Sequence, residues 1–152
     1  MKPNAEFKHS IYKECIKVLG DRIKNAKDAM EAAQEAANGE EKSSAGDKYE
    51  TSRAMGHRDR EMYARQMVEA QNELNKIERL NLDPLNSIKL GSLLHTQNGL
   101  YFIMTGIGKL EIDGTSVMVI SRESPIAAVM MGKAVNNEFT WQGTKIKILE
   151  IL

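Results

Sequence analysis

The stretch "AANGEEKSSAGDKYE", residues 36–50, separates two long runs in which apolar residues recur at helical spacing. It is polar, acidic and rich in small residues, and Gly39 and Gly46 bracket it as a helix stop and a loop residue. Ser44 followed by Asp47 fits the pattern of a helix N-cap. The stretch therefore predicts a turn that reverses the chain between two helices.

Apolar or small residues form one stripe on each side of this turn. The first stripe has the 4-3-4-3-4-3-4 spacing of a heptad seam, and its members are Tyr12, Ile16, Leu19, Ile23, Ala26, Met30, Ala33 and Ala37. The second stripe comprises Tyr49, Gly56, Tyr63, Met67, Ala70, Leu74, Ile77 and Leu80. Paired antiparallel, the stripes bring large residues together at the base and small residues together near the turn. They predict a two-helix coiled-coil hairpin, with helices of about 33 residues and on the order of 50 Å; a dimerising coiled coil is the alternative.

The second helical run is expected to end at Asp83-Pro84, because proline lacks an amide donor and disfavours a helical residue before it. Beyond this point the sequence changes to short β-rich runs. Ser124-Pro125 interrupts these runs and opens a short helix, with proline in its first turn and Gly132 at its end.

Three β-hairpins are predicted in this second part of the chain. Each consists of two apolar runs joined by a turn dipeptide, and the dipeptides are Asn98-Gly99, Asp113-Gly114 and Gln142-Gly143. The predicted fold class is α+β. An N-terminal antiparallel helical hairpin, residues 1–82 with its tip at 38–46, precedes a small antiparallel β domain with one short helix, residues 83–152.

Charge and composition exclude several classes of function. The chain has 21 basic and 21 acidic side chains, whereas tight nonspecific phosphate binding needs clustered excess Lys and Arg, so any nucleic acid is expected to be met through another protein. No signal-peptide pattern and no run of roughly 18 apolar residues is present, so a cytoplasmic location without membrane contact is expected. The single cysteine, Cys15, excludes an internal disulfide and is predicted to be a buried thiol.

The stretch "ESPIAAVMMGKAVNNEFTW", residues 123–141, followed by "KIKILEIL", residues 145–152, resembles the C-terminal domain of the Gre transcript-cleavage factor family. In these GreA/GreB-like transcription elongation factors a Ser-Pro-Ile-Ala helix, a Gly-Lys turn and a closing strand occur in this order. The resemblance implies an FKBP-like fold for residues 86–152. It also implies that this domain binds the rim of the RNA polymerase secondary channel, and that the helical hairpin enters the channel. The partner-binding residues carried over are Ser124, Pro125, Ile126 and Ala127.

The same resemblance implies a role for the acidic tip. A tip carboxylate would help the polymerase to retain a second Mg²⁺, so that water cleaves backtracked RNA. The candidate acids are Glu40, Glu41 and Asp47, and they are expected to hold no metal in the free protein. The protein would then be a monomeric accessory factor without catalytic residues of its own, and it would meet nascent RNA only indirectly.

This chain departs from the family at the tip. The family pairs an Asp with a Glu three residues on; aligned on Tyr49, this chain has Lys42 and Ala45 at those places. Its acids flank the family pair and do not occupy its positions. Two forms of the function therefore stay open: a factor that supports RNA cleavage, and a regulator that binds the channel without cleavage.

A peptide-binding, prolyl-isomerase or chaperone module with a coiled-coil arm is the alternative from a different class. An isomerase pocket needs clustered aromatic side chains, and the candidates are Tyr101, Phe102, Phe139 and Trp141. His57 and Glu61 lie one helical turn apart but show no HExxH pattern, so a solvated helix face is favoured over a metal site.

Overall fold

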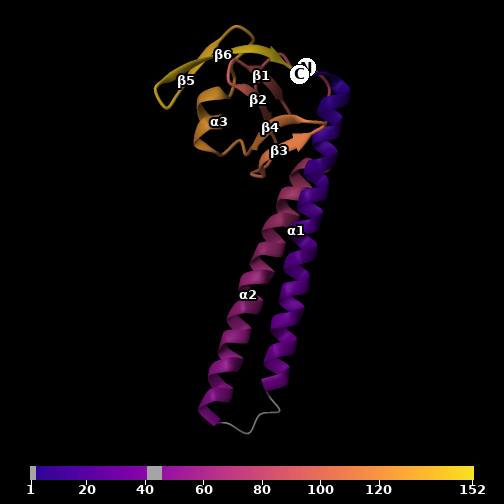
Figure 1. Cartoon of the computed structure of the whole chain (residues 1–152), viewed down its shortest axis with the longest axis vertical. Coiled ribbons are helices and arrows are strands. Elements are labelled where there is room, and N and C mark those ends of the chain that lie inside the picture. The colour runs from indigo at the N-terminus through magenta and orange to yellow at the C-terminus, as the bar shows by residue number, and fades with distance from the viewer. Residues whose placement is uncertain (1–2, 41–45) are drawn as a thin grey trace. The chain divides into compact units, whose positions relative to one another are not determined.

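The computed structural model describes residues 3–40 and 46–152, with side chains described for residues 3–38 and 54–152. The chain forms two compact units. The hairpin unit is Lys17–Lys76, and the β unit combines the residues up to Ile16 with Ile77–Leu152. Figure 1 labels the helices and strands of both units.

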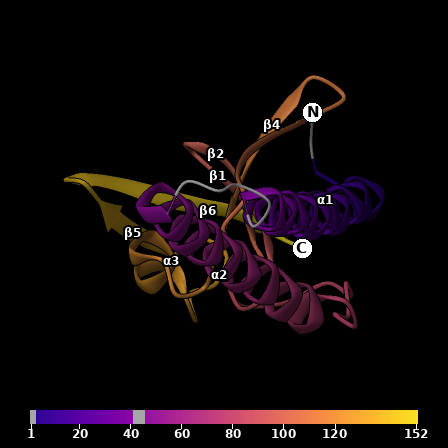
Figure 2. The ribbon, with the colours of Figure 1, turned by 90° about the horizontal axis from the view of Figure 1, so that it is seen from below.

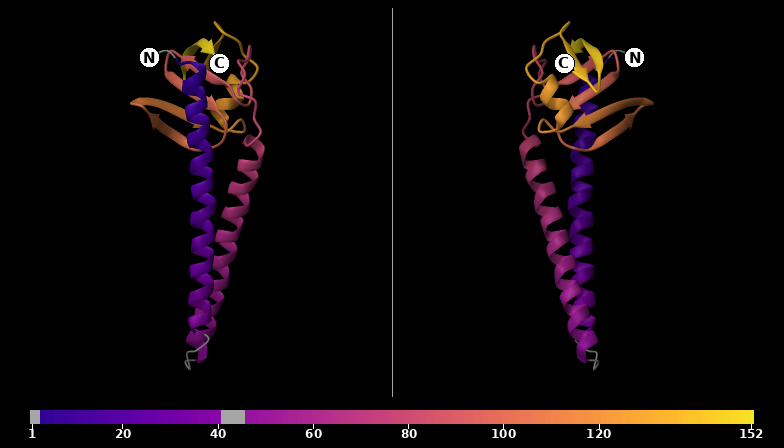
Figure 3. Two further views of the ribbon diagram at one scale, coloured as in Figure 1. Left: turned by 90° about the vertical axis from the view of Figure 1, so that its right-hand side faces the viewer. Right: turned by 90° about the vertical axis from the view of Figure 1, so that its left-hand side faces the viewer.

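Two long helices account for the first half of the chain. α1 (Ala5–Glu40) has 36 residues and α2 (Gly46–Ile77) has 32. In the hairpin unit they lie side by side, as the views in Figure 3 agree. The predicted two-helix hairpin is confirmed, and α1 runs one residue past Gly39, the expected helix stop.

The seam between the two helices follows the predicted stripes. Leu19, Ala26 and Ala37 of α1 are buried in the hairpin unit, and so is Ala70 of α2. Alanine dominates these buried positions, which lets the two helices approach closely.

The ends of the helices are fixed by hydrogen bonds. The Asn4 side chain caps α1 by accepting a bond from the Phe7 N–H at 2.7 Å. α2 ends at Ile77, six residues before the expected stop at Asp83-Pro84. The Tyr12 hydroxyl lies 2.7 Å from the carbonyl oxygen of Ile77 and 2.8 Å from that of Glu78. The hydroxyl has one proton, which these two carbonyl oxygens share, and the Ile77 oxygen also accepts from the Leu80 N–H at 3.1 Å. These bonds close the end of α2 before the proline is reached.

The β unit contains a six-stranded sheet in the order β3-β4-β2-β1-β6-β5. The strands are β1 (Leu93–Thr96), β2 (Gly99–Ile103), β3 (Gly108–Ile112), β4 (Thr115–Ile120), β5 (Glu138–Trp141) and β6 (Thr144–Ile151). The three predicted hairpins are present as β1–β2, β3–β4 and β5–β6. β2 and β4 pair parallel, so the sheet is mixed and differs in this pair from the antiparallel expectation.

The first hairpin turn differs in detail from the prediction. Thr96 pairs with Gly99, so the loop residues are Gln97 and Asn98 in place of Asn98-Gly99. The positive φ of 116° falls on Gly99, a conformation that glycine adopts without steric cost. The Thr96 hydroxyl donates to the Gly99 carbonyl at 2.9 Å and accepts from the Asn98 N–H at 3.1 Å. The other two loops, Asp113-Gly114 and Gln142-Gly143, have positive φ at both residues, as type I′ turns require.

A helix covers one face of this sheet. α3 (Pro125–Met130) lies beside β5, which Figure 2 shows from a second direction. Its residues Ala127 and Met130 are fully buried in a core cluster shared with the sheet. The other members of this core are Ile88, Leu94, Ile103, Ile120, Phe139, Ile146, Ile148 and Ile151. Apolar packing of the sheet therefore fixes α3 and the residues that precede it.

Candidate functional site

Two of the three predicted tip acids lie at helix ends of the hairpin unit. Glu40 is the last residue of α1, and Asp47 is the second residue of α2. Glu41 falls outside the described residues, and the side chains of Glu40 and Asp47 fall outside the described side chains. Their role as tip acids stays a prediction.

The described part of the hairpin closest to this turn is a tight helix–helix contact. A Cβ atom added at Gly56 would lie 2.9 Å from the Cβ of Ala37 and 3.4 Å from the carbonyl oxygen of Ala33. Carbon atoms in relaxed contact lie about 3.5–4.0 Å apart. Only glycine at position 56 therefore allows this spacing of α1 and α2. Gly56 thus sets the distance between the two helices in this part of the hairpin unit.

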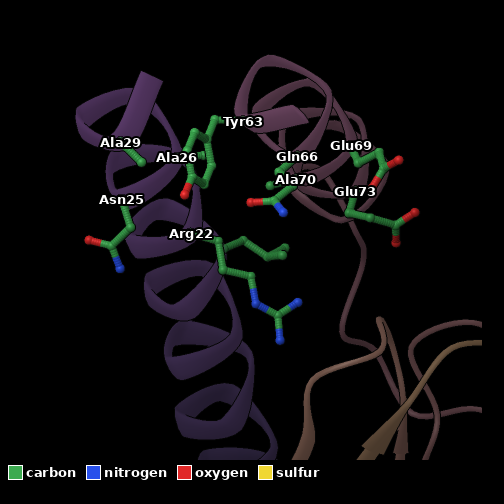
Figure 4. A pocket seen from close by; sticks show the side chains of 10 residues that line it. Arg22, Asn25, Ala26, Ala29, Tyr63, Gln66, Glu69, Ala70 and Glu73 are labelled. Carbon is green, nitrogen blue, oxygen red and sulfur yellow. The ribbon is translucent and has the colours of Figure 1, made fainter. Parts of the chain in front are cut away.

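Further from the turn, the helices of the hairpin unit leave a groove of about 450 Å³. Figure 4 shows Tyr63 of α2 lying in the space between the helices next to Ala26 of α1, while Glu69 and Glu73 point away from α1. The groove is lined by Leu19, Arg22, Asn25, Ala26, Ala29, Tyr63, Gln66, Glu69, Ala70 and Glu73. The small side chains on both helices explain the gap, because alanine does not fill the space that larger seam residues occupy elsewhere.

The predicted partner-binding motif forms the start of α3. Ser124 is the N-cap, with φ −69° and ψ 152°, and its hydroxyl oxygen accepts a bond from the Ala127 N–H at 3.3 Å. The same hydroxyl donates to the Ser121 carbonyl oxygen at 2.7 Å. Pro125 occupies the first turn, where its missing N–H costs nothing. The motif residues thus build a rigid, capped helix start.

Two charged side chains flank this helix start. Arg122 and Glu123 are exposed and form an ion pair, with 3.4 Å between the Arg122 Nε and a Glu123 carboxylate oxygen. The Ser121 hydroxyl donates to the other Glu123 oxygen. This hydrogen bond is the main reason why the pKa of Glu123 lies below its ordinary value, and Arg122 adds to the effect. Glu123 therefore presents a negative charge beside the motif at neutral pH.

Burial separates the roles of the four motif residues. Ala127 is fully buried in the core, Ser124 uses its hydroxyl for the cap, and Ile126 packs partly against the core. Pro125 is exposed. A partner that approaches the helix start would meet Pro125 and the edge of Ile126, together with Arg122 and Glu123, and partner binding itself stays a prediction.

Sequence reasoning missed the flanking pair and the tight helix contact. Arg122 and Glu123 directly precede Ser124, and exposure of their side chains follows from the turn that the cap creates. The signal for Gly56 was its place on the second apolar stripe, where a glycine among larger residues indicates close backbone approach.

The four aromatic side chains considered for an isomerase pocket belong to strands of the sheet and contribute to the packing of the β unit. Phe102 and Phe139 are buried, and Tyr101 and Trp141 pack against the core of the β unit. Burial also raises the pKa of Tyr101 above its ordinary value. Phe102 and Phe139 are therefore closed to a ligand, while Tyr101 and Trp141 keep part of their surface exposed.

Among the residues that the structure describes, no group of three or more His, Cys, Asp or Glu side chains is placed to hold a metal ion. Within the same part of the chain, no helix has the length and apolar character needed to cross a membrane.

No protein-family model matches the chain, and no curated protein matches it. Two similar solved structures are the crystal structure of GreA factor homolog 1 (Gfh1) protein of Thermus thermophilus and a structure of the transcription factor Gfh1. The first has 12% identity and a TM-score of 0.37, over 90% of this chain and 94% of that chain. The second has 15% identity and a TM-score of 0.34, over 92% of each chain.

Proposed function

We propose that this protein is a Gre-type transcription factor that binds RNA polymerase at its secondary channel and modulates elongation. It acts as an accessory factor, and the chemistry takes place at the active centre of the polymerase. One observation carries the proposal: a single chain joins a helical hairpin, with acids at the ends of its helices, to a β unit that presents Pro125 at a capped, exposed helix start.

The start of α3 supports the binding half of this function. A rigid surface loses little conformational entropy when a partner binds. The Ser124 cap and the burial of Ala127 hold Pro125 in place before any partner arrives. Arg122 and Glu123 add one charge of each sign beside it, which favours a specific orientation over tight nonspecific attachment.

The hairpin unit supports the other part of the proposed function, in which acidic residues enter the secondary channel. Residues 17–40 of α1 span about 36 Å at about 1.5 Å per residue, and two helices of about 10–12 Å diameter make a narrow body. The tight contact between Gly56 and Ala37 keeps the helices close toward the turn. Such a body is suited to carry Glu40, Glu41 and Asp47 into a confined space.

Mg²⁺ enters this proposal only within the complex. Glu40, Glu41 and Asp47 are the residues proposed to lie near the metal of the polymerase, and contact with nascent RNA is made there.

Co-purification with core RNA polymerase tests the binding. We expect the full chain to retain polymerase, and the double variant Arg122→Glu/Pro125→Ala to retain much less. Both changes leave the core untouched, since both side chains are exposed. Lys109→Glu is the matched control on an exposed strand and should behave like the unchanged protein. No retention by the unchanged protein, or equal retention by the double variant, would contradict the proposed surface.

RNA cleavage in stalled elongation complexes separates the two forms of the function. A cleavage factor shortens the RNA in the presence of Mg²⁺, and the triple variant Glu40→Ala/Glu41→Ala/Asp47→Ala loses this activity while it keeps polymerase binding. A non-cleaving regulator binds equally well and leaves the RNA length unchanged. Shortening at the same rate by the triple variant would remove these three acids from the mechanism.

A further inference from the structure

β5 is an edge strand of the sheet and pairs with β6 on one side only. Trp141 faces Thr144 across the two-residue loop, and the Ile148 N–H donates to the Asn137 carbonyl at 2.9 Å. Backbone groups alternate in direction along an antiparallel strand. The N–H and C=O groups of Glu138 and Thr140 therefore point away from β6, and no strand of the described chain lies beside them.

A groove of about 460 Å³ lies between α3 and this strand. Its walls are Ala128 and Val129 of α3, Met131 and Lys133 after the helix, and Glu138, Phe139 and Thr140 of β5. Val129 and Met131 are half-buried, so part of their apolar surface is open to the groove. Side chains of an added strand alternate between the two faces of a sheet, so every second side chain of such a strand would enter the groove.

The corner around β5 is basic. Lys133 lines the groove, while Lys147 and Lys145 pair in register with Glu138 and Thr140 on the neighbouring strand. Three lysines against one glutamate attract an acidic segment and disfavour a basic one.

The opposite edge of the sheet, β3, carries a different set of side chains. Lys109 and Glu111 are both exposed and lie 3.8 Å apart as an ion pair. Charged side chains along an edge strand oppose the addition of another strand. β5 carries one charged side chain, Glu138, where β3 carries two, so the edge of β5 is the better place for an added strand.

We propose that the β5 edge and the α3–β5 groove bind an extended acidic segment of a partner protein, which adds to the sheet as a further strand. The backbone of Glu138 and Thr140 supplies the hydrogen bonds. An apolar side chain of the segment lies against Val129 and Met131, and an acidic side chain faces Lys133. The surface is separate from the residues proposed to meet polymerase, and the inference does not depend on the proposed function.

The probe for this inference is the blocked peptide acetyl-Glu-Val-Thr-Val-Glu-Val-amide, added to the isotopically labelled full chain. We expect saturable NMR shifts at residues 129–133 and 138–141. Because backbone groups alternate in direction along a strand, only one of two neighbouring peptide amides faces the β5 edge. N-methylation at both the Thr and the second Val of the peptide therefore removes one donor to the edge in either register and should weaken binding about tenfold. Replacing both acids of the peptide by lysine should weaken binding by a similar factor.

Two protein variants test the same contacts from the other side. Thr140→Pro removes an outward N–H that the sheet does not use and should weaken peptide binding, whereas Thr140→Ala keeps the amide and is the control. Lys133→Glu should weaken binding, with Lys109→Glu as its matched control. Should Thr140→Pro fail to fold, the N-methylated peptide makes the same test on the unchanged protein.

Three results would overturn the proposal. The first is no shift at β5 with millimolar peptide, and the second is equal binding of the N-methylated peptide. The third is self-association in analytical ultracentrifugation that Thr140→Pro abolishes, because a second copy of the chain would then occupy the edge. Failure of polymerase binding has no bearing on these results, so the two proposals can fail separately.

Discussion

Replacement of Gly56 by alanine tests the close approach of the two helices in the hairpin unit. The new Cβ would lie 2.9 Å from the Cβ of Ala37 and 3.4 Å from the Ala33 carbonyl. To reach a relaxed carbon–carbon distance of about 3.5–4.0 Å, the helices must separate by roughly 0.6–1 Å at this level. Neither contact atom belongs to a flexible side chain, so the backbone has to move.

Two opposing terms set the size of the effect. Overpacking in a well-packed contact costs about 1–3 kcal/mol, while alanine in place of glycine inside a helix contributes about 1 kcal/mol. Gly56→Ala is therefore expected to change the stability of the hairpin unit by between about zero and a loss of about 2 kcal/mol. Gly20→Ala is the matched control, because an added Cβ there meets nothing within 4 Å. It should stabilise the same unit by about 1 kcal/mol.

Amide hydrogen exchange across residues 33–38 and 54–60 measures this difference locally. We expect faster exchange in Gly56→Ala than in Gly20→Ala. The double variant Ala37→Gly/Gly56→Ala removes the clashing atom, and its coupling energy should be about 1–2 kcal/mol in favour of the pair. Equal stabilisation by both glycine replacements would refute the close contact.

Three further predictions concern single side chains of the β unit. Tyr12→Phe removes the hydroxyl that lies 2.7 Å from the Ile77 carbonyl and should cost about 1–2 kcal/mol in urea unfolding; an unchanged midpoint would argue against this cap. Ser124→Ala removes the N-cap of α3 and should cost about 1 kcal/mol, with faster exchange of the Ala127 amide as its local sign; unchanged exchange would show that the cap is not needed. Burial raises the pKa of the Cys15 thiol from 9.0 to about 12, so the unfolded chain loses this proton first as pH rises. Stability should then fall by up to about 1.4 kcal/mol per pH unit between the two pKa values. Cys15→Val should lack this slope between pH 9 and 10.5, and the same slope in both proteins would contradict the assignment.

The hairpin could be predicted because its signal is local and periodic. A helix repeats every 3.6 residues, so a stripe such as Leu19, Ala26 and Ala37 defines a buried face without knowledge of the rest of the fold. The turn dipeptides located the β-hairpins for a similar reason, since each joins neighbouring strands.

The parallel pairing of β2 with β4 could not be predicted in the same way. The parallel direction depends on how the β3–β4 hairpin packs back onto β2. No residue in Leu100–Ile103 indicates by itself whether its strand pairs parallel or antiparallel. The early end of α2 could not be predicted from local sequence either. The Tyr12 hydroxyl that contacts the carbonyl oxygen of Ile77 is far from Ile77 in the sequence.

In the candidate site, too, local features could be predicted from the sequence, whereas features that depend on the whole fold could not. Ser124 and Pro125 were identified as a helix start from local capping chemistry. The burial of Ala127 depends on the sheet beneath α3, and therefore only the fold distinguishes it from the exposed Pro125.

Photo-crosslinking from position 41 tests whether the hairpin enters the polymerase secondary channel. A photoreactive amino acid at position 41 is placed in a stalled elongation complex whose RNA is labelled at its 3′ end, and the same amino acid at the exposed position 21 serves as the control. We expect a crosslink from position 41 to the RNA or to the polymerase active centre, and none to these targets from position 21. Absence of any crosslink from position 41, under conditions in which the complex forms, would contradict the claim that the hairpin carries its acids into the polymerase channel.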